Sequence, residues 1–290
     1  MLKRIINSRT RDKIKKSALE NPNLDDVDFL IKIAKSTNDY SASAVKNPNL
    51  KDDNALVDIV ENSIKKWTRY NALSKIEDQG VLMNFLKSKD VDIQSRVISK
   101  IDDVNTLEQN AMFNQSSEVR FNAIANPKFT NQELLIHIAK NNHEDTIRKL
   151  AVSKITDSDV LLEIYRNSND DIKEEIIKNP HFTDESILID YATAADFYGT
   201  RRNAVKNPNL KNQKVLLEIL LNEKDFTVRE EAIKKITDYD VLLKVLKEEK
   251  SQFVRQEAVE LLNKDDLIYL VENDINEDVR QKAREKLETM

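Results

Sequence analysis

The sequence repeats itself at a nearly constant interval, and this feature constrains the fold more than any other. Two kinds of ending alternate along the chain, an Asn-Pro type as in KNPNL (46–50) and a Lys-Ile type as in SKITD (153–157). Each ending follows a central small or apolar residue, and these residues stand 25–28 positions apart. The eleven central residues, which we call anchors, are Ala18, Ala44, Ala72, Val97, Ala123, Ala151, Ile176, Ala204, Ala232, Ala258 and Ala283. Repeats of this length are typical of chains in which small units stack on one another, each contacting its neighbours.

Within each copy, the apolar residues are spaced as on helices. Around Ala232 the apolar positions are four before the anchor, the anchor itself, and one and four residues after it. These positions lie on one face of a helix. A second stripe follows in VLLEIL (215–220) and its equivalents. The sequence therefore predicts an all-α fold, an α-α superhelix of about 11 two-helix repeats of 25–28 residues.

The small number of glycines and the positions of the prolines support this prediction. The chain has only 2 Gly and 5 Pro in 290 residues, which argues against turn-rich β folds and glycine-rich nucleotide loops. Proline disfavours the α conformation in the residue before it. We therefore expect the first helix of a copy to end near Asn47, Asn126 or Asn207.

The pattern V-R-x-x-A-[VI]-x-N-P followed by L-L-x-x-[LA] resembles the HEAT-like α-solenoids, and among them the leucine-rich-variant repeats. It stands here as TRRNAVKNPNLKNQKVLLEIL (200–220), and the resemblance extends over about residues 11–290. It implies one α-solenoid domain over 1–290, with an N-terminal cap at 1–10, repeats at 11–278 and a C-terminal capping helix at 279–290. Some leucine-variant proteins carry an iron–sulfur domain, which a chain without cysteine cannot ligate.

Nothing in the sequence indicates catalysis, and we expect no enzyme activity, no cofactor and no metal. Cysteine is absent, and His137, His143 and His181 are not in the paired spacing of metal ligands. Phosphate-binding loops and nucleophile elbows are also missing. No apolar run reaches the length of a membrane span, so we expect a cytoplasmic protein that does not enter membranes.

Arginine recurs three residues before the anchor in seven copies. Two interpretations are open: a basic stripe for nucleic acid, or a structural ladder that bonds to helix-end carbonyls and to Asp side chains of neighbouring repeats. HEAT-like repeats use this position structurally, and Arg suits such multidentate pairing, so we favour the ladder. Its members are Arg69, Arg120, Arg148, Arg201, Arg229, Arg255 and Arg280.

Copies two to five differ from the others at the positions two and one before the anchor and two after it. These positions are charged in late copies, as at Glu230 and Glu231, but small, amide or aromatic in copies two to five. By the HEAT resemblance, these helices line the concave face. We therefore predict a groove for a protein or peptide; alternatively, the rings tuck against neighbouring helices. The candidate binding residues are Tyr70, Asn71, Arg96, Phe121 and Asn122.

The segment DYATAADFYGTRRN (190–203) combines three aromatic residues with Gly199. Its simpler interpretation is a helix that ends at Gly199 and a new one capped by Thr200. The alternative is an aromatic-rich binding loop.

Two functions follow from the sequence. The first is a noncatalytic scaffold that binds a protein or peptide on the concave face. The alternative is a nucleic-acid-binding protein resembling the HEAT-like alkylpurine DNA glycosylases, which use a basic channel with Trp, Asp and Arg. Trp67 is the only tryptophan here, and residues 101–200 hold 9 basic and 18 acidic side chains. An acidic middle disfavours a phosphate backbone, so nucleic acid is an unlikely partner.

Overall fold

A computed structural model describes residues 1–8 and 11–290; residues 9–10 of the predicted N-terminal cap lie outside this part. The described residues form 22 α-helices and no strand, which confirms the predicted all-α solenoid of two-helix repeats. Contacts divide the chain into two compact units, unit 1 (Met1–Asn131) and unit 2 (Gln132–Met290).

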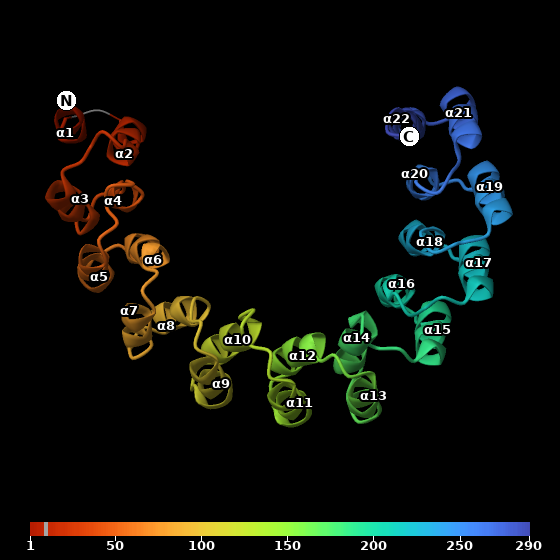
Figure 1. The fold of residues 1–290 in the computed structure, drawn as a ribbon, viewed down its shortest axis with the longest axis horizontal. Helices are drawn as coiled ribbons and strands as arrows, with labels where there is room; N and C mark the ends of the chain where they lie inside the picture. Colours follow the sequence, from red (N-terminus) through yellow and green to blue (C-terminus); the bar gives the residue numbers. More distant parts are fainter. Residues whose placement is uncertain (9–10) are drawn as a thin grey trace. The chain divides into compact units, whose positions relative to one another are not determined.

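Unit 1 contains the first ten helices. They are α1 (Leu2–Ile6), α2 (Asp12–Glu20), α3 (Val27–Ala34), α4 (Ser41–Val45), α5 (Asp53–Asn62), α6 (Lys66–Lys75), α7 (Gln79–Phe85), α8 (Val91–Ile98), α9 (Val104–Phe113) and α10 (Ser117–Ala125). Consecutive even-numbered helices pack side by side from α2 to α10, and odd-numbered helices pack on them from the other side. Within the unit, the even-numbered helices lie on the inner side of the bend (Figure 1).

Unit 2 contains the remaining twelve helices. They are α11 (Gln132–Asn141), α12 (Asp145–Lys154), α13 (Ser158–Arg166), α14 (Asp170–Lys178), α15 (Glu185–Ala194), α16 (Tyr198–Lys206), α17 (Gln213–Asn222), α18 (Phe226–Ile233), α19 (Tyr239–Glu248), α20 (Gln252–Val259), α21 (Lys264–Asn273) and α22 (Glu277–Glu288). The arrangement is the same, with the even-numbered helices of this unit packed in a row from α12 to α22. We call the even-numbered helices of each unit its inner helices.

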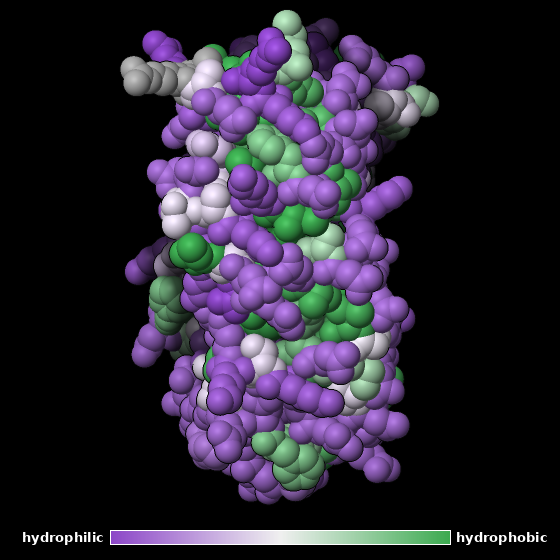
Figure 2. Space-filling view, turned by 90° about the vertical axis from the view of Figure 1, so that its left-hand side faces the viewer, coloured by the Kyte–Doolittle hydropathy of each residue, from purple (hydrophilic) through white to green (hydrophobic). Residues whose placement is uncertain are grey.

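All eleven anchors are buried, with exposed fractions of 5% or less, so the helical periodicity identified the core correctly. The stripe fails once, at Ile14, whose side chain is 48% exposed on α2. Inner helices end where the Asn-Pro rule predicts: α10 and α16 stop at Asn126 and Asn207, which cap them. Hydrophobic residues that remain at the surface gather in separate patches between hydrophilic ones (Figure 2).

Gly199 does not end a helix, contrary to the simpler interpretation of the 190–203 segment. Helix α15 already ends at Ala194, and Gly199 lies in the first turn of α16, which Phe197 precedes as the N-cap residue. No residue of the described chain has a positive φ angle, so a left-handed cap is not the reason for this glycine.

Candidate functional site

In four of the five Asn-Pro endings, the Asn joins its repeat to the preceding one. Asn126 is buried, and its Nδ2 donates to the carbonyl oxygens of Ile98 (3.0 Å) and Ile101 (2.9 Å). Its Oδ1 accepts from the backbone N–H of Lys128 at 2.9 Å. Because buried carbonyls need partners, this side chain satisfies groups that the end of α8 leaves open. Equivalent bonds to the preceding repeat are made by Asn47, Asn179 and Asn207.

Where the ending is of the Lys-Ile type, lysine takes over the same role. The Lys100 ammonium donates to the carbonyls of Ser74 (2.8 Å) and Ile76 (2.5 Å), and Lys75 and Lys235 likewise donate to carbonyls of the repeat before their own. Burial lowers the pKa of these lysines, and in Lys235 it lowers the pKa to about 8. The two endings that alternate in the sequence therefore perform one structural task, an equivalence that the sequence did not reveal.

The predicted arginines bind backbone carbonyls in the last turn of the preceding odd-numbered helix or in the loop that follows it. Arg255 is buried, and its Nη1 donates to Glu249 O at 2.9 Å while Nε and Nη2 form a fork on Asp274 at 2.9 and 3.0 Å. Arg201 and Arg229 form the same fork on Glu223 and Glu249. Each of these acidic residues is the C-cap residue of the odd-numbered helix that follows the arginine's own helix.

The other four arginines keep the carbonyl contact and vary the second partner. Arg69 donates to Val60 O (2.8 Å) and pairs with Asp90. Arg148 donates to Ala139 O (2.9 Å) and pairs with Asp145. Arg120 and Arg280 reach the carbonyls of Asn114 and Asp274. These bonds engage the guanidinium groups within the protein, which leaves little for a phosphate backbone.

Tyr70 is not the exposed anchor that the groove prediction requires. Its side chain is only 7% exposed, and its hydroxyl donates to Asp92 Oδ2 at 2.7 Å. The Arg96 guanidinium lies 3.8 Å from the ring centroid, so the ring is covered by a cation–π contact. Lys66 also pairs with Asp92. The alternative interpretation, a ring tucked against a neighbouring helix, is the correct one for Tyr70.

The other candidates are drawn together along the same row of inner helices. Asn122 donates through Nδ2 to Ser95 Oγ at 2.6 Å, and Ser95 donates to Glu118 at 2.7 Å. Asn122, Phe121 and Asn71 are half-buried, whereas Arg96 is exposed. The structure thus brings Tyr70 to Arg96, and Asn122 to the same helix through Ser95.

A packing rule explains this arrangement. The inner helices stand side by side, so a residue two before one anchor faces the residue one before the next anchor. Tyr70 and Arg96, and Ser95 and Asn122, are such pairs. Helical periodicity predicts which residues leave the core, but not that they turn toward a neighbouring helix.

Trp67 is the exposed aromatic residue of this surface, and it was not among the binding residues predicted from the sequence. It is 70% exposed on α6 and contacts Tyr70 edge to face, with ring centroids 5.8 Å apart. It stands four residues before Asn71 and seven before Ser74, which places all three on one side of the helix. This i, i+4, i+7 row was readable in the sequence. We call Trp67, Asn71, Ser74 and Arg96 the tryptophan surface.

The equivalent positions of unit 2 carry ion pairs. Arg202 bonds to the buried Glu231 at 2.8 Å, and Lys234 pairs with Glu230, Glu231 and Glu257. Further along, Lys286 pairs with Glu260 at 3.1 Å. The inner helices of unit 2 therefore neutralise most of their own charge.

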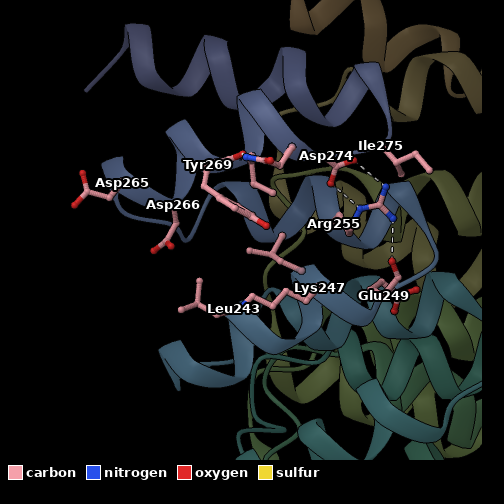
Figure 3. A pocket seen from close by; sticks show the side chains of 12 residues that line it. Leu243, Lys247, Glu249, Arg255, Asp265, Asp266, Tyr269, Asp274 and Ile275 are labelled. Carbon is pink, nitrogen blue, oxygen red and sulfur yellow. Dashed lines mark hydrogen bonds and ion pairs between the residues drawn. The ribbon is translucent and has the colours of Figure 1, made fainter.

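A cavity of about 550 Å³ lies between α19 and α21 (Figure 3). Leu243, Tyr269 and the Arg255–Asp274 pair line it. The polar atoms of that pair already bond to each other and to the backbone, as the dashed lines show (Figure 3). The cavity contains no constellation of nucleophile and base.

Among the residues that the structure describes, no group of three or more His, Cys, Asp or Glu residues could hold a metal ion. No helix among residues 1–8 and 11–290 has the length and apolar character needed to span a bilayer. His137, His143 and His181 are exposed.

No protein-family model matches the sequence. No curated protein matches it either. Among solved structures, the chain is similar to a leucine-rich repeat variant with a novel repetitive structural motif, at 18% identity and a TM-score of 0.49, over 79% of this chain and 88% of that one. It is also similar to a designed armadillo repeat protein in complex with peptide (KR)4, at 15% identity and a TM-score of 0.12, over 99% and 97% of the two chains. The solenoid assignment rests on the helices and their packing.

Proposed function

We propose that the protein is a noncatalytic scaffold that binds a protein or peptide through the tryptophan surface of unit 1. The exposure of Trp67 supports this most directly. A large aromatic side chain left 70% exposed loses the free energy that burial would give, and binding sites are enriched in such residues.

The surroundings of Trp67 suit a preorganised anchor. Tyr70 packs against its ring, and Tyr70 is itself held by the hydroxyl bond to Asp92 and by the Arg96 guanidinium. A ring whose support is already fixed loses little conformational entropy on binding. Asn71 and Arg96 would supply directional hydrogen bonds to the partner, as would Asn122 further along the row. Trp67 therefore takes the role of exposed aromatic anchor that the groove prediction gave to Tyr70.

Charge separates this function from the nucleic-acid alternative. Unit 1 holds 21 basic and 18 acidic side chains, and unit 2 holds 25 and 33. The arginine ladder, which would have to contact phosphates, is engaged with carbonyls and carboxylates. A strong phosphate interface needs clustered basic groups that are free to release counterions, so we do not propose nucleic acid as the partner.

The test is a selection of random displayed peptides on the full-length chain, followed by titration of the selected peptides. Trp67 is the only tryptophan, so its fluorescence emission reports directly on this surface. We expect a blue shift on binding and a loss of about 1–3 kcal/mol of binding free energy in Trp67→Ala.

The matched control is Phe113→Ala, which removes another exposed ring of unit 1, 78% exposed at the end of α9. It should bind the selected peptides as the unaltered chain does. Selected peptides that bind Trp67→Ala equally well would contradict the proposal.

A further inference from the structure

Four exposed aromatic rings stand at the N-terminal ends of three consecutive inner helices of unit 2. Phe197 and Tyr198 begin α16, Phe226 begins α18 and Phe253 lies in the first turn of α20, with exposed fractions of 60, 46, 39 and 49%. Because α16 packs on α18 and α18 on α20, these helix ends form a row. We call the four residues the aromatic edge.

The rings of the aromatic edge are ordered among themselves. Phe226 and Phe253, from neighbouring repeats, are stacked with centroids 5.4 Å apart and planes inclined by 27°. The Phe197 and Tyr198 centroids lie 4.8 Å apart. Exposed apolar clusters of this kind mark interaction sites more often than single exposed rings do.

The Phe197 ring occupies space that a side chain at position 199 would need. A Cβ atom at Gly199 would lie 2.4 Å from Phe197 Cε1, so only glycine leaves room for the ring where it stands. Glycine inside a helix costs about 1 kcal/mol relative to alanine. Since no positive φ angle requires glycine here, the space for the ring is what the glycine provides.

Two lysines that precede the rings of α18 and α20 in the sequence are free to bind a carboxylate. Lys224 and Lys250 are exposed two and three residues before Phe226 and Phe253, and in the described part of the chain neither ammonium has an ion-pair partner. Among the nearby carboxylates, Glu223 and Glu249 bind Arg201 and Arg229. Glu248 is exposed and lies in the same surface hollow as both lysines.

Two further carboxylates, Asp225 and Asp196, lie close to the rings in the sequence. Asp225 caps α18 by accepting from Thr227 N at 2.9 Å. Asp196 is exposed at the α16 end and limits the cationic stretch there. The rings of α18 and α20 therefore stand beside two free cations, in a unit with eight more acidic than basic side chains.

We propose that the aromatic edge docks a peptide segment in which acidic and apolar residues alternate. The apolar side chains would pack on the Phe226–Phe253 stack and on the Phe197–Tyr198 pair, and the carboxylates would pair with Lys224 and Lys250. An anionic bilayer would also attract aromatic rings and lysines, but surfaces that bind anionic lipids carry clusters of about four to eight basic residues, whereas the proposal rests on Lys224 and Lys250 alone. The observations therefore favour a peptide. This surface lies in unit 2, so the proposal stands independently of the tryptophan surface.

The test uses the full-length chain and dye-labelled peptides, with binding followed by fluorescence anisotropy. The probes are a peptide of alternating Glu and Leu, a Lys-Leu peptide and a Glu-Ser peptide of the same length. We expect the Glu-Leu peptide to bind best. Affinity should fall about tenfold in Phe253→Ala and in Lys250→Glu, the size typical of a central anchor.

Gly199→Ala is the decisive variant, because alanine favours the helix while its Cβ displaces the Phe197 ring. It should weaken the Glu-Leu peptide and leave the melting temperature unchanged or higher. Phe113→Ala, in unit 1, is the control and should bind normally. Equal binding of the Lys-Leu peptide, no binding of any peptide, or indifference to all three variants would overturn the proposal. So would binding to phosphatidylserine vesicles alone, which would indicate a lipid surface.

Discussion

The inner helices of the two units pack in the same arrangement, but different kinds of interaction join neighbouring helices in each. In unit 1, neighbouring helices are joined by hydrogen bonds and a cation–π contact, as between Tyr70, Asp92 and Arg96. In unit 2, the equivalent positions carry ion pairs such as Arg202–Glu231, and bidentate Arg–carboxylate forks join an inner helix to the end of the odd-numbered helix that follows it. The backbone arrangement is the same in both.

The difference teaches how a repeat protein separates stability from binding. At these positions of unit 2, charged side chains such as Arg202, Glu231 and Lys234 pair with each other, and a partner that used them would first have to break those pairs. Unit 1 joins its inner helices mainly through hydrogen bonds and leaves Trp67 unburied. Sequence variation at the same three positions of the repeat thus decides whether a surface closes on itself or stays open.

The largest effect that tests this comparison is expected at Arg255 of unit 2. Arg255→Ala leaves the buried Asp274 carboxylate without its cation, so we expect a loss of about 3–5 kcal/mol in the free energy of unfolding. Urea denaturation measures it. Arg280→Ala, whose partner Glu277 is largely exposed, is the control and should cost far less. Equal losses would show that burial of the fork adds nothing.

A smaller effect is expected in unit 1 at Tyr70. Tyr70→Ala removes a buried ring and should lower the free energy of unfolding by about 2–3 kcal/mol, whereas Tyr70→Phe loses only the bond to Asp92, about 1 kcal/mol. Thermal and urea unfolding distinguish the two. If Tyr70→Ala left stability unchanged, the ring would be a free surface group and the contrast between the units would fail.

The anchors and Tyr70 show what the sequence could predict and what it could not. The period of the apolar stripe located every anchor, because burial in a helix follows its 3.6-residue repeat. The exposure of Tyr70 was not predictable in this way. It depends on how far one helix is rotated against the next, and that rotation is set by contacts between repeats.

The same limit applies to the two kinds of ending and to Gly199. Asn and Lys differ in size and charge, so the sequence separates them, although both donate to equivalent carbonyls of the preceding repeat. Gly199 looks like a helix stop because glycine usually serves backbone conformation, whereas here it makes room for the Phe197 ring. Local rules miss a role that a side chain elsewhere imposes.

A pH-dependent effect is expected from Lys235 of unit 2, whose pKa burial lowers from 10.5 to about 8. Between these values the unfolded chain binds more protons than the folded one, so the free energy of unfolding should rise with pH over this window. Lys235→Met removes the titrating group. The difference between the unaltered chain and this variant, measured by urea unfolding from pH 7 to 10.5, should therefore grow in favour of the unaltered chain. A difference that stays flat would mean that the lysine titrates normally.

The smallest effect on stability is expected at Trp67, and it completes the comparison. Trp67→Ala removes a ring that is 70% exposed, so the free energy of unfolding should change by no more than about 0.5 kcal/mol. Tyr70→Ala, three residues away on the same helix, should cost several times more. Urea unfolding of the two variants side by side is the measurement. A ring that contributes nothing to folding yet stays at a fixed place on α6 is available for binding. A large loss of stability in Trp67→Ala would instead make it part of the packing, and the inner helices of unit 1 would then be as closed as the ion-paired positions of unit 2.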